Sequence, residues 1–254
     1  MKELVYTKTK IPEVTAREIT KLLEIKEYPI NLMEVLKKVG LSFKEENLSG
    51  GVEAMLVMAD EKAGIIINKK QPYQERKNFS IAHELGHYFI TSHQGQSYQC
   101  VDIGQFGTKK NHIELEADQF ASEFLMPTQE FLKEECVNNP TIENIISASK
   151  KYNTSITATA IKCMDLTEES CAIVVIQNDK LLWSRKSENF FYDINPKIKE
   201  TYAYEIRTEG KEREKNVLYS HFWGSDFKSD YIEEDCINFK RLDKQLCLIK
   251  EYYN

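Results

Sequence analysis

Two histidines and a glutamate within residues 81–90 have the types and the spacing that a metal site requires. The segment reads Ile-Ala-His-Glu-Leu-Gly-His-Tyr-Phe-Ile, which places His83 and His87 four positions apart. On a helix they would lie about 40° apart around the axis and about 6 Å apart along it, so both imidazoles can reach one ion. Glu84 would project beside them toward a water molecule that the ion activates. The alternative is a pair of partly exposed helical histidines that bind no ligand.

The surrounding segment is predicted to be a helix from Pro72 to His93. Proline suits a first helical position, and no later proline interrupts the run. Gly86 costs about 1 kcal/mol relative to alanine inside a helix, which indicates that another group approaches the backbone there. Apolar residues recur at three- and four-residue steps and form a stripe that a core would bury: Phe79, Ala82, Leu85, Phe89 and Ile90.

A second helix, predicted over residues 112–126, supplies carboxylates for a third ligand. Glu114 and Asp118 are one turn apart, so Glu114 can bind the metal while Asp118 accepts a hydrogen bond from a ligating imidazole. Glu116 lies about 200° around the helix from Glu114, so only one of the two can face the metal. Glu123 is the other competitor, and Glu114 is preferred because it alone is followed by an acidic residue four positions later. The alternative is that all four form a solvated acidic face.

The two segments together carry a resemblance to a known family. The run from Ile81 to His87 is followed by Glu114-x-Glu-Ala-Asp-x-Phe-Ala-x-x-Phe-Leu-Met-Pro, and it is preceded by Gly-Ile-Ile-Ile-Asn68, Glu-Arg76 and Phe-Ser-Ile81. Over roughly residues 14–130 the chain resembles the ImmA/IrrE family of bacterial metallo-endopeptidases. Phe124 stands where such proteins often carry leucine, which should leave the chemistry unaffected.

The resemblance implies roles for the site residues. His83, His87 and Glu114 would be ligands of Zn²⁺, and Glu84 would be the catalytic base, as in a gluzincin-like zinc metallo-endopeptidase. A further donor should stabilise the oxyanion that forms during peptide hydrolysis. The sequence does not choose among four candidates for that donor: His112, Tyr88, Tyr98 and His93.

The resemblance also implies a substrate. Members of the family cleave helix-turn-helix transcriptional repressors, which derepresses genes of mobile elements or stress responses, so the expected partner is such a protein. The alternative function is a non-proteolytic, zinc-binding transcriptional regulator that acts through DNA or protein binding. A third hypothesis, an interaction protein with an inactive site, is disfavoured by the presence of Glu84.

Composition limits the remaining function classes. The net charge of −6 and the pI of about 5.6 do not favour a nucleic-acid partner held through phosphates. The sequence contains no run of eighteen apolar residues that could span a membrane. The first ten residues lack the apolar segment of a signal peptide. The cysteines are scattered without a Cys-x-x-Cys pair, so we expect reduced thiols in a cytoplasmic protein: Cys100, Cys136, Cys163, Cys171, Cys236 and Cys247.

The predicted fold class is α+β, beginning with a zincin-like metallopeptidase domain over residues 1–138. A sheet edge in it would be a natural dock for an extended peptide. The long loop at 94–111 is expected to rim the active site. The remaining predicted elements are helices at Thr15–Ile25 (with Thr15 and Glu18 as a capping box) and Asn31–Gly40, and strands at Leu41–Lys44, Gly51–Met58 and Gly64–Asn68.

Two further parts are predicted downstream. Residues 139–167 have the layout of a helix-turn-helix, with helices at Ile142–Lys151 and Ile156–Met164, but three lysines against two acids do not make a basic recognition helix. Residues 168–254 are expected to form a smaller α/β regulatory or substrate-recognition domain. Its expected elements are a hairpin of Ala172–Ile176 with Leu181–Trp183, a short helix from Asn195-Pro196, and strands near Tyr202–Ile206, His221–Trp223 and Gln245–Ile249.

Overall fold

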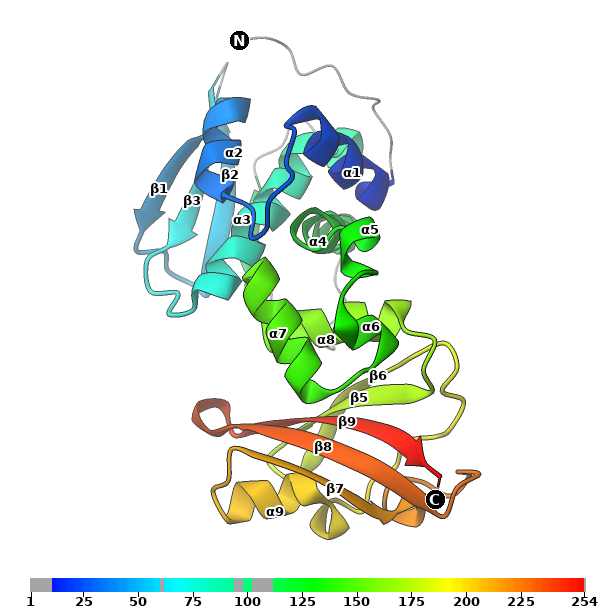
Figure 1. Cartoon of the computed structure of the whole chain (residues 1–254). Coiled ribbons are helices and arrows are strands. Elements are labelled where there is room, and N and C mark those ends of the chain that lie inside the picture. Colours follow the sequence, from blue (N-terminus) through cyan, green and yellow to red (C-terminus); the bar gives the residue numbers. More distant parts are fainter. Residues whose placement is uncertain (1–10, 60–61, 94–97, 102–111, 254) are drawn as a thin grey trace. The chain divides into compact units, whose positions relative to one another are not determined.

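The computed structural model describes residues 11–59, 62–93, 98–101 and 112–253, with the backbone alone for 98–101. The chain forms two compact units (Figure 1). The N-terminal unit comprises the described residues up to Glu130 together with Lys150–Ser155. The C-terminal unit comprises Phe131–Ser149 together with the chain from Ile156 onward. The α+β class expected from the sequence is confirmed.

The N-terminal unit is built on a four-stranded sheet in the order β1-β3-β2-β4. The strands are β1 (Ser42–Glu46), β2 (Val52–Ala59), β3 (Lys62–Asn68) and β4 (Tyr98–Val101). β1 pairs parallel with β3, and the other pairs are antiparallel; the strands expected at Gly51–Met58 and Gly64–Asn68 are confirmed as the antiparallel neighbours β2 and β3. The expectation of a continuous loop over 94–111 is wrong for β4, because those four residues pair with a strand more than forty positions upstream, which no local pattern reveals.

Three helices are layered on this sheet. α3 (Gln74–Phe89) packs on β2 and β3, α4 (His112–Leu125) packs on α3, and α1 (Pro12–Leu22) packs on α4 (Figure 1). The sheet residues that this packing buries alternate along their strands, as a pleated sheet with one covered face requires: Ala54, Leu56, Ile65 and Ile67.

Gly86 lies where α3 packs closely against α4. A Cβ at this position would lie 3.1 Å from the Cα of Ala117 and 3.3 Å from the Cβ of Phe120. The close approach predicted from this glycine is therefore confirmed, and it holds the two helices that carry the candidate ligands side by side.

The helix ends confirm one prediction and correct two. α2 (Leu32–Val39) is capped by Asn31, whose side chain accepts from the backbone N–H of Glu34 at 3.2 Å, and it ends at Gly40 with φ +76°. α1 begins at Pro12 rather than Thr15, because the fixed φ of proline suits the first helical position. The Thr15 hydroxyl is not a cap and donates to the Ile11 carbonyl at 3.1 Å.

The start of α3 and the end of α1 also differ from the prediction. α3 begins at Gln74 and not at Pro72, because Tyr73 is extended and its carbonyl accepts the first helical hydrogen bond, from Lys77 at 3.1 Å. α1 ends at Leu22, three residues before the expected end, because Glu24 adopts a left-handed φ of +54°. α3 likewise ends at Phe89 and is followed by the short helix η1 (Thr91–His93).

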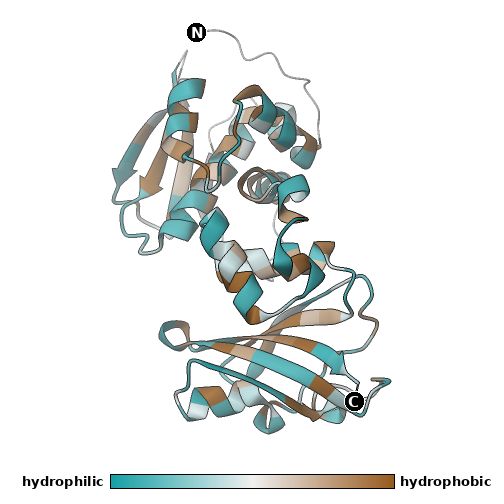
Figure 2. Ribbon diagram, in the orientation of Figure 1, coloured by the Kyte–Doolittle hydropathy of each residue, from teal (hydrophilic) through white to brown (hydrophobic). Residues whose placement is uncertain are grey.

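The C-terminal unit is built on a five-stranded antiparallel sheet in the order β6-β5-β9-β8-β7. Its strands are β5 (Cys171–Gln177), β6 (Lys180–Lys186), β7 (Arg213–Tyr219), β8 (Tyr231–Phe239) and β9 (Lys244–Tyr252). Asn178 and Asp179 both have positive φ in the turn between β5 and β6, which confirms that predicted hairpin. β5 is buried on both faces, whereas Figure 2 shows mixed hydrophobic and hydrophilic segments along the other strands.

Two strands predicted in this unit are wrong. The segment from Tyr202 is the helix α9 (Tyr202–Thr208), because Ala203 and Ile206, three positions apart, are the residues buried against the sheet. His221 lies in the short helix η3 (Ser220–Phe222). β9 confirms the strand expected at Gln245–Ile249, while β7 and β8 were not predicted. The short helix expected at Asn195 is η2 (Ile198–Glu200), and η4 (Lys240–Leu242) lies between β8 and β9.

The segment between the two sheets is helical. α7 (Ile142–Tyr152) and α8 (Ile156–Leu166) confirm the predicted helix pair, and the shorter α5 (Thr128–Phe131) and α6 (Glu135–Asn138) precede them. The Asp235 carboxylate on β8 accepts from the backbone N–H of Ile142 at 3.0 Å and from the Arg213 guanidinium at 2.9 Å, which ties the start of α7 to the C-terminal sheet. Among the described residues, no helix has the length and apolar character needed to cross a membrane.

Cys236 and Cys247 form a disulfide, so the expectation of reduced thiols is wrong for this pair. They are directly opposite each other on β8 and β9, with their Cα atoms 4.2 Å apart. The sequence does not contain this register, which is why the pairing was not predicted. Cys136, Cys163 and Cys171 are buried free thiols.

Candidate metal centre

The structure brings His83, His87 and Glu114 together where α3 packs against α4. The Nε2 atoms of His83 and His87 are 3.1 Å apart. The Glu114 carboxylate lies 3.2 Å from Nε2 of His83 and 3.5 Å from Nε2 of His87. One side-chain atom of each residue lies within 4.8 Å of those of the other two, so the three could hold a metal ion.

The spacing of these donor atoms fits Zn²⁺. Two ligands bound tetrahedrally at about 2.0–2.1 Å from zinc are about 3.3 Å apart, close to the three separations just given. Two imidazole nitrogens and one carboxylate oxygen are also a donor set that catalytic zinc sites use, with a fourth position left for water. Two imidazoles that face each other through Nε2 share either a hydrogen or a metal ion between the two nitrogens.

Asp118 fixes the orientation of His83. Its Oδ1 lies 2.9 Å from Nδ1 of His83, on the side of the ring opposite to Glu114. When Nδ1–H donates to this carboxylate, Nε2 is left with the lone pair that binds a metal. Burial alone would lower the pKa of His83, but the hydrogen bonds to Asp118 and Glu114 outweigh it and raise the pKa to about 9. A metal bound at Nε2 of His83 would therefore displace a proton near neutral pH.

The other two ligand candidates are in the ionisation states that metal binding needs. Burial, with help from the two neighbouring histidines, lowers the pKa of His87, which favours the neutral imidazole. Burial would raise the pKa of Glu114, but its hydrogen bonds with His83 and His87 outweigh burial and hold that pKa well below the usual range. Glu114 is also 30% exposed, so the cluster is open to solvent on the carboxylate side.

Glu84 is fully buried one residue after the first histidine. Its negative charge is close enough to contribute to the raised pKa of His83. The role of Glu84 as the base that takes a proton from a metal-bound water stays a prediction.

The competing carboxylates of α4 have other partners. Glu123 is buried and accepts from the Thr128 hydroxyl at 2.6 Å and from the Arg17 guanidinium at 3.1 Å, which joins α4 to α5 and α1. Glu116 lies 2.7 Å from Nε2 of His93 and 3.2 Å from Nδ1 of His112. Of the α4 carboxylates weighed as metal ligands, Glu114 is the one placed between the two histidines of α3.

His93 is buried behind His87 and not beside Glu114. Its Nδ1 lies 3.1 Å from Nδ1 of His87, on the ring edge opposite to the metal-facing Nε2. The sequence suggested His93 only as an oxyanion donor, and this contact was not predicted. A signal was present: His93 follows His87 by six residues, the spacing at which metzincins carry a third zinc-binding histidine, although Ile90 replaces their glycine.

The other oxyanion candidates are placed as follows. His112 is 82% exposed, and its Nδ1 faces Glu116. Tyr88 is half-buried, and its ring lies edge-on to Phe89 with the ring centroids 5.1 Å apart. The side chain of Tyr98 lies outside the described residues. No one of these is singled out as the donor.

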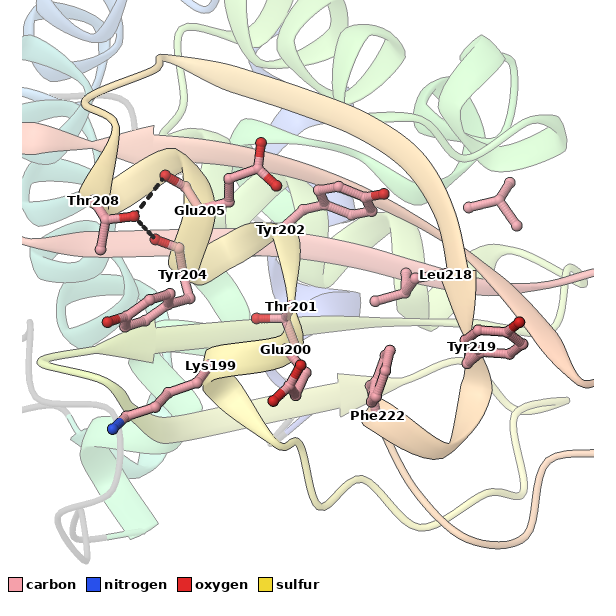
Figure 3. A pocket seen from close by; sticks show the side chains of 11 residues that line it. Lys199, Glu200, Thr201, Tyr202, Tyr204, Glu205, Thr208, Leu218, Tyr219 and Phe222 are labelled. Carbon is pink, nitrogen blue, oxygen red and sulfur yellow. Dashed lines mark hydrogen bonds between the residues drawn. The ribbon is translucent and has the colours of Figure 1, made fainter.

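The C-terminal unit contains a second cluster of potential metal ligands and a surface hollow. Glu234, Cys236 and Cys247 form a second group whose donor atoms lie within 4.8 Å of one another. A hollow of about 550 Å³ lies between η2, α9 and β7, with Tyr202, Tyr219 and Phe222 among its lining residues (Figure 3). None of the site residues predicted from the sequence lines this hollow.

Comparison with known proteins identifies a family and a similar fold. The sequence model of the family described as the IrrE N-terminal-like domain, a peptidase family, matches residues 36–164, just over half of the chain. No curated protein matches. A solved structure described as a "Mycobacterium tuberculosis transcriptional regulator" is similar in fold, with a TM-score of 0.61 and 10% identity over 95% of this chain and 76% of that one. The chain thus belongs to the ImmA/IrrE peptidase family.

Proposed function

We propose that the protein is a zinc-dependent, gluzincin-like endopeptidase whose metal is held by His83, His87 and Glu114. The convergence of these three donor groups at separations that match tetrahedral zinc is the observation that supports the proposal. The peptidase family to which the chain belongs supports the same reaction class.

The side chains around the cluster have complementary roles in this proposal. Zinc bound there would activate water and polarise the carbonyl of the scissile peptide bond. Glu84 is the general base, which takes a proton from the attacking water and passes it to the leaving amine. Asp118 keeps His83 in the tautomer that leaves Nε2 available.

The first test is hydrolysis by the zinc-loaded full chain of a mixture of unstructured peptides, with products identified by mass spectrometry. We expect cleavage that stops when a chelator is added and returns with zinc. Glu84→Gln should be inactive, and Glu75→Gln, the same change on the same helix but outside the cluster, should keep activity. Cleavage that persists in the chelated protein would overturn the assignment.

We further propose that the substrate is a helix-turn-helix transcriptional repressor, whose cleavage derepresses its genes. In this proposal residues 1–138 carry out hydrolysis, residues 139–167 form a structural helical segment, and residues 168–254 recognise the substrate or regulate cleavage. β4 is an edge of the N-terminal sheet within the described residues, and its unpaired side is a candidate dock for an extended peptide.

The substrate proposal has its own test, which is incubation of the wild type and of Glu84→Gln with any helix-turn-helix repressor encoded next to this protein. A single chelator-sensitive cut made only by the wild type is expected. If the repressor stays intact while other peptides are cleaved, the substrate proposal fails and the endopeptidase remains.

A second candidate function is a zinc-binding transcriptional regulator without proteolysis, which is favoured by the similarity in fold to a structure described as a transcriptional regulator. DNA binding requires a cationic surface, and α8 does not provide one. Lys162 is its one basic residue, and the nearby Arg185 is paired with Asp165 of α8 at 2.6 Å. Salt-dependent binding to duplex DNA at nanomolar to micromolar protein would support the DNA-binding form of this candidate, and its absence would exclude that form.

A further inference from the structure

A buried chain of hydrogen-bonding groups extends from the back of His87. Nδ1 of His87 lies 3.1 Å from Nδ1 of His93, and Nε2 of His93 lies 2.7 Å from Oε2 of Glu116. His87 and His93 are both buried, and Glu116 is mostly buried. This chain starts at the ring nitrogen of His87 that does not face the metal position.

The order of donors and acceptors along this chain follows from the carboxylate at its end. A carboxylate only accepts hydrogen bonds, so Nε2 of His93 carries the hydrogen that it donates to Glu116. A neutral His93 then presents a lone pair at Nδ1, which can accept only if Nδ1 of His87 carries a hydrogen. His87 is consequently left with its lone pair on Nε2, the atom 3.1 Å from Nε2 of His83.

The backbone after α3 creates this contact. Ile90 leaves the helix in an extended conformation with φ −68° and ψ 120°, and η1 then turns the chain back, with His93 N–H donating to the Ile90 carbonyl at 3.0 Å. The turn brings His93, six residues after His87, against the ring of His87. Because this turn fixes the backbone of His93, its ring is well suited to keep the His87 side chain in one rotamer.

The two histidines of the cluster are therefore held in matching ways. His83 is backed directly by Asp118 at 2.9 Å, and His87 is backed by Glu116 through the ring of His93. Both backing carboxylates come from α4, which also supplies Glu114. Carboxylates behind metal-bound imidazoles orient the ring and increase its basicity.

Resting on the proposed zinc site, we propose that His93 and Glu116 are positioning residues that hold His87 in the tautomer and orientation required to bind the metal. In this role His93 is neither a metal ligand nor an oxyanion donor. The competing role is a structural one, in which the pair stabilises the fold and does not influence the metal.

The two roles predict different results for zinc affinity, which is measured on the full chain by competition with a chromophoric chelator. His93→Phe fills the space but removes the acceptor, and it should weaken zinc binding by about 10–100-fold. His93→Asn keeps a short acceptor near the same position and should recover part of the loss. His221→Asn, a change of the same type in the C-terminal unit, is the matched control and should bind zinc as the wild type does.

Cobalt substitution supplies a readout that a structural role does not change. The absorption bands of bound Co²⁺ depend on ligand orientation, so they should shift in His93→Phe and remain as in the wild type in His221→Asn. Thermal unfolding of the metal-free proteins shows whether the fold is kept. If His93→Phe does not fold, Glu116→Gln decides the question, because it keeps the shape of the side chain and removes the charge behind His93.

Weaker zinc binding and shifted cobalt bands in a folded variant of His93 or Glu116 would support the inference. Wild-type zinc affinity and wild-type cobalt bands in the folded variants would overturn it and leave the proposed zinc peptidase intact. If the wild-type protein itself takes up no zinc, the proposed function fails and this inference fails with it.

Discussion

The group on α3 and α4 and the group on β8 and β9 each bring three potential metal ligands within 4.8 Å of one another. They differ in what else their donor atoms contact. In the first group the Nε2 atoms of His83 and His87 face each other and Glu114, while the hydrogen bonds at Nδ1 point away from the cluster. In the second group the sulfurs of Cys236 and Cys247 are bonded to each other.

The carboxylate of the second group is also committed to the fold. Glu234 is fully buried and accepts from the indole N–H of Trp223 and from the backbone N–H of Ala203, both at 2.8 Å. These contacts join β8 to α9 and to the segment after η3. The proximity of suitable residue types therefore does not define a metal site, because the partner of each donor atom decides what it can bind.

The largest expected effect is a difference in zinc binding between matched glutamate variants of the two groups. Glu114→Gln removes an anionic ligand. It should weaken zinc binding by more than about 100-fold, the largest loss expected when a residue that only hydrogen-bonds to a ligand is changed. Glu234→Gln should leave the zinc stoichiometry of the wild type. Metal content after dialysis measures both. Loss of zinc from Glu234→Gln together with retention of zinc by Glu114→Gln would contradict this prediction.

The second effect is a pH dependence of stability in the C-terminal unit. Burial raises the pKa of Glu234 to about 7, above the ordinary value of 4.5. The stabilisation from this carboxyl is fully present below about pH 4.5 and is lost as the pH rises through about 7, a change of about 3 kcal/mol. Both tryptophans, Trp183 and Trp223, lie in this unit, so urea unfolding followed by tryptophan fluorescence reports on it.

Glu234→Gln is the control for that prediction, because an amide does not titrate in this range. Its free energy of unfolding should vary less between about pH 5 and about pH 8 than that of the wild type, by about 2–3 kcal/mol. Equal pH dependence in the two proteins would show that Glu234 is ionised in the folded state at both pH values.

A smaller effect is expected from the carboxylate behind His83. Asp118→Ala removes the acceptor at Nδ1 and should weaken zinc binding by about 10–100-fold while the fold is kept. The measurement is chelator competition, with Asp179→Ala, which removes an exposed partner of Arg207, as the control. Zinc affinity equal to that of the control would show that the orientation of His83 does not depend on Asp118.

The smallest effect concerns Glu123, the α4 carboxylate directed away from the histidines. Glu123→Gln should lower the free energy of unfolding by about 1 kcal/mol, because the hydrogen bonds from Thr128 and Arg17 weaken and Arg17 is partly exposed. Zinc binding should not change. Denaturant unfolding and metal content together check this, and a loss of zinc would make Glu123 a ligand candidate again.

Local sequence patterns predicted the parts of the site that depend on one helix at a time. The four-residue spacing of His83 and His87, and that of Glu114 and Asp118, places each pair on one helical face, and the structure brings these faces together. The hairpin at Asn178-Asp179 and the cap at Asn31 were predictable for the same reason, because turn and cap preferences are local.

Features that depend on distant pairing could not be predicted in this way. The Cys236–Cys247 bond requires the register of β8 and β9, and the contact of His93 with His87 requires the reversal at Ile90. The segment at Tyr202 has alternating aromatic residues typical of a strand, but burial of Ala203 and Ile206 against the sheet selects a helix. β7 was missed because its charged residues are paired across the sheet, as Lys215 is with Glu233 at 3.1 Å.

The central claim is that the cluster on α3 and α4 holds zinc and uses Glu84 to hydrolyse a peptide bond. Metal content and peptide cleavage, measured in parallel on the wild type and on Glu84→Gln, test it most directly. We expect about one zinc per chain in both proteins and a cleavage rate lower by about 10²–10⁴-fold in the variant. Equal cleavage by the two proteins, or cleavage by a protein that binds no metal, would contradict the claim.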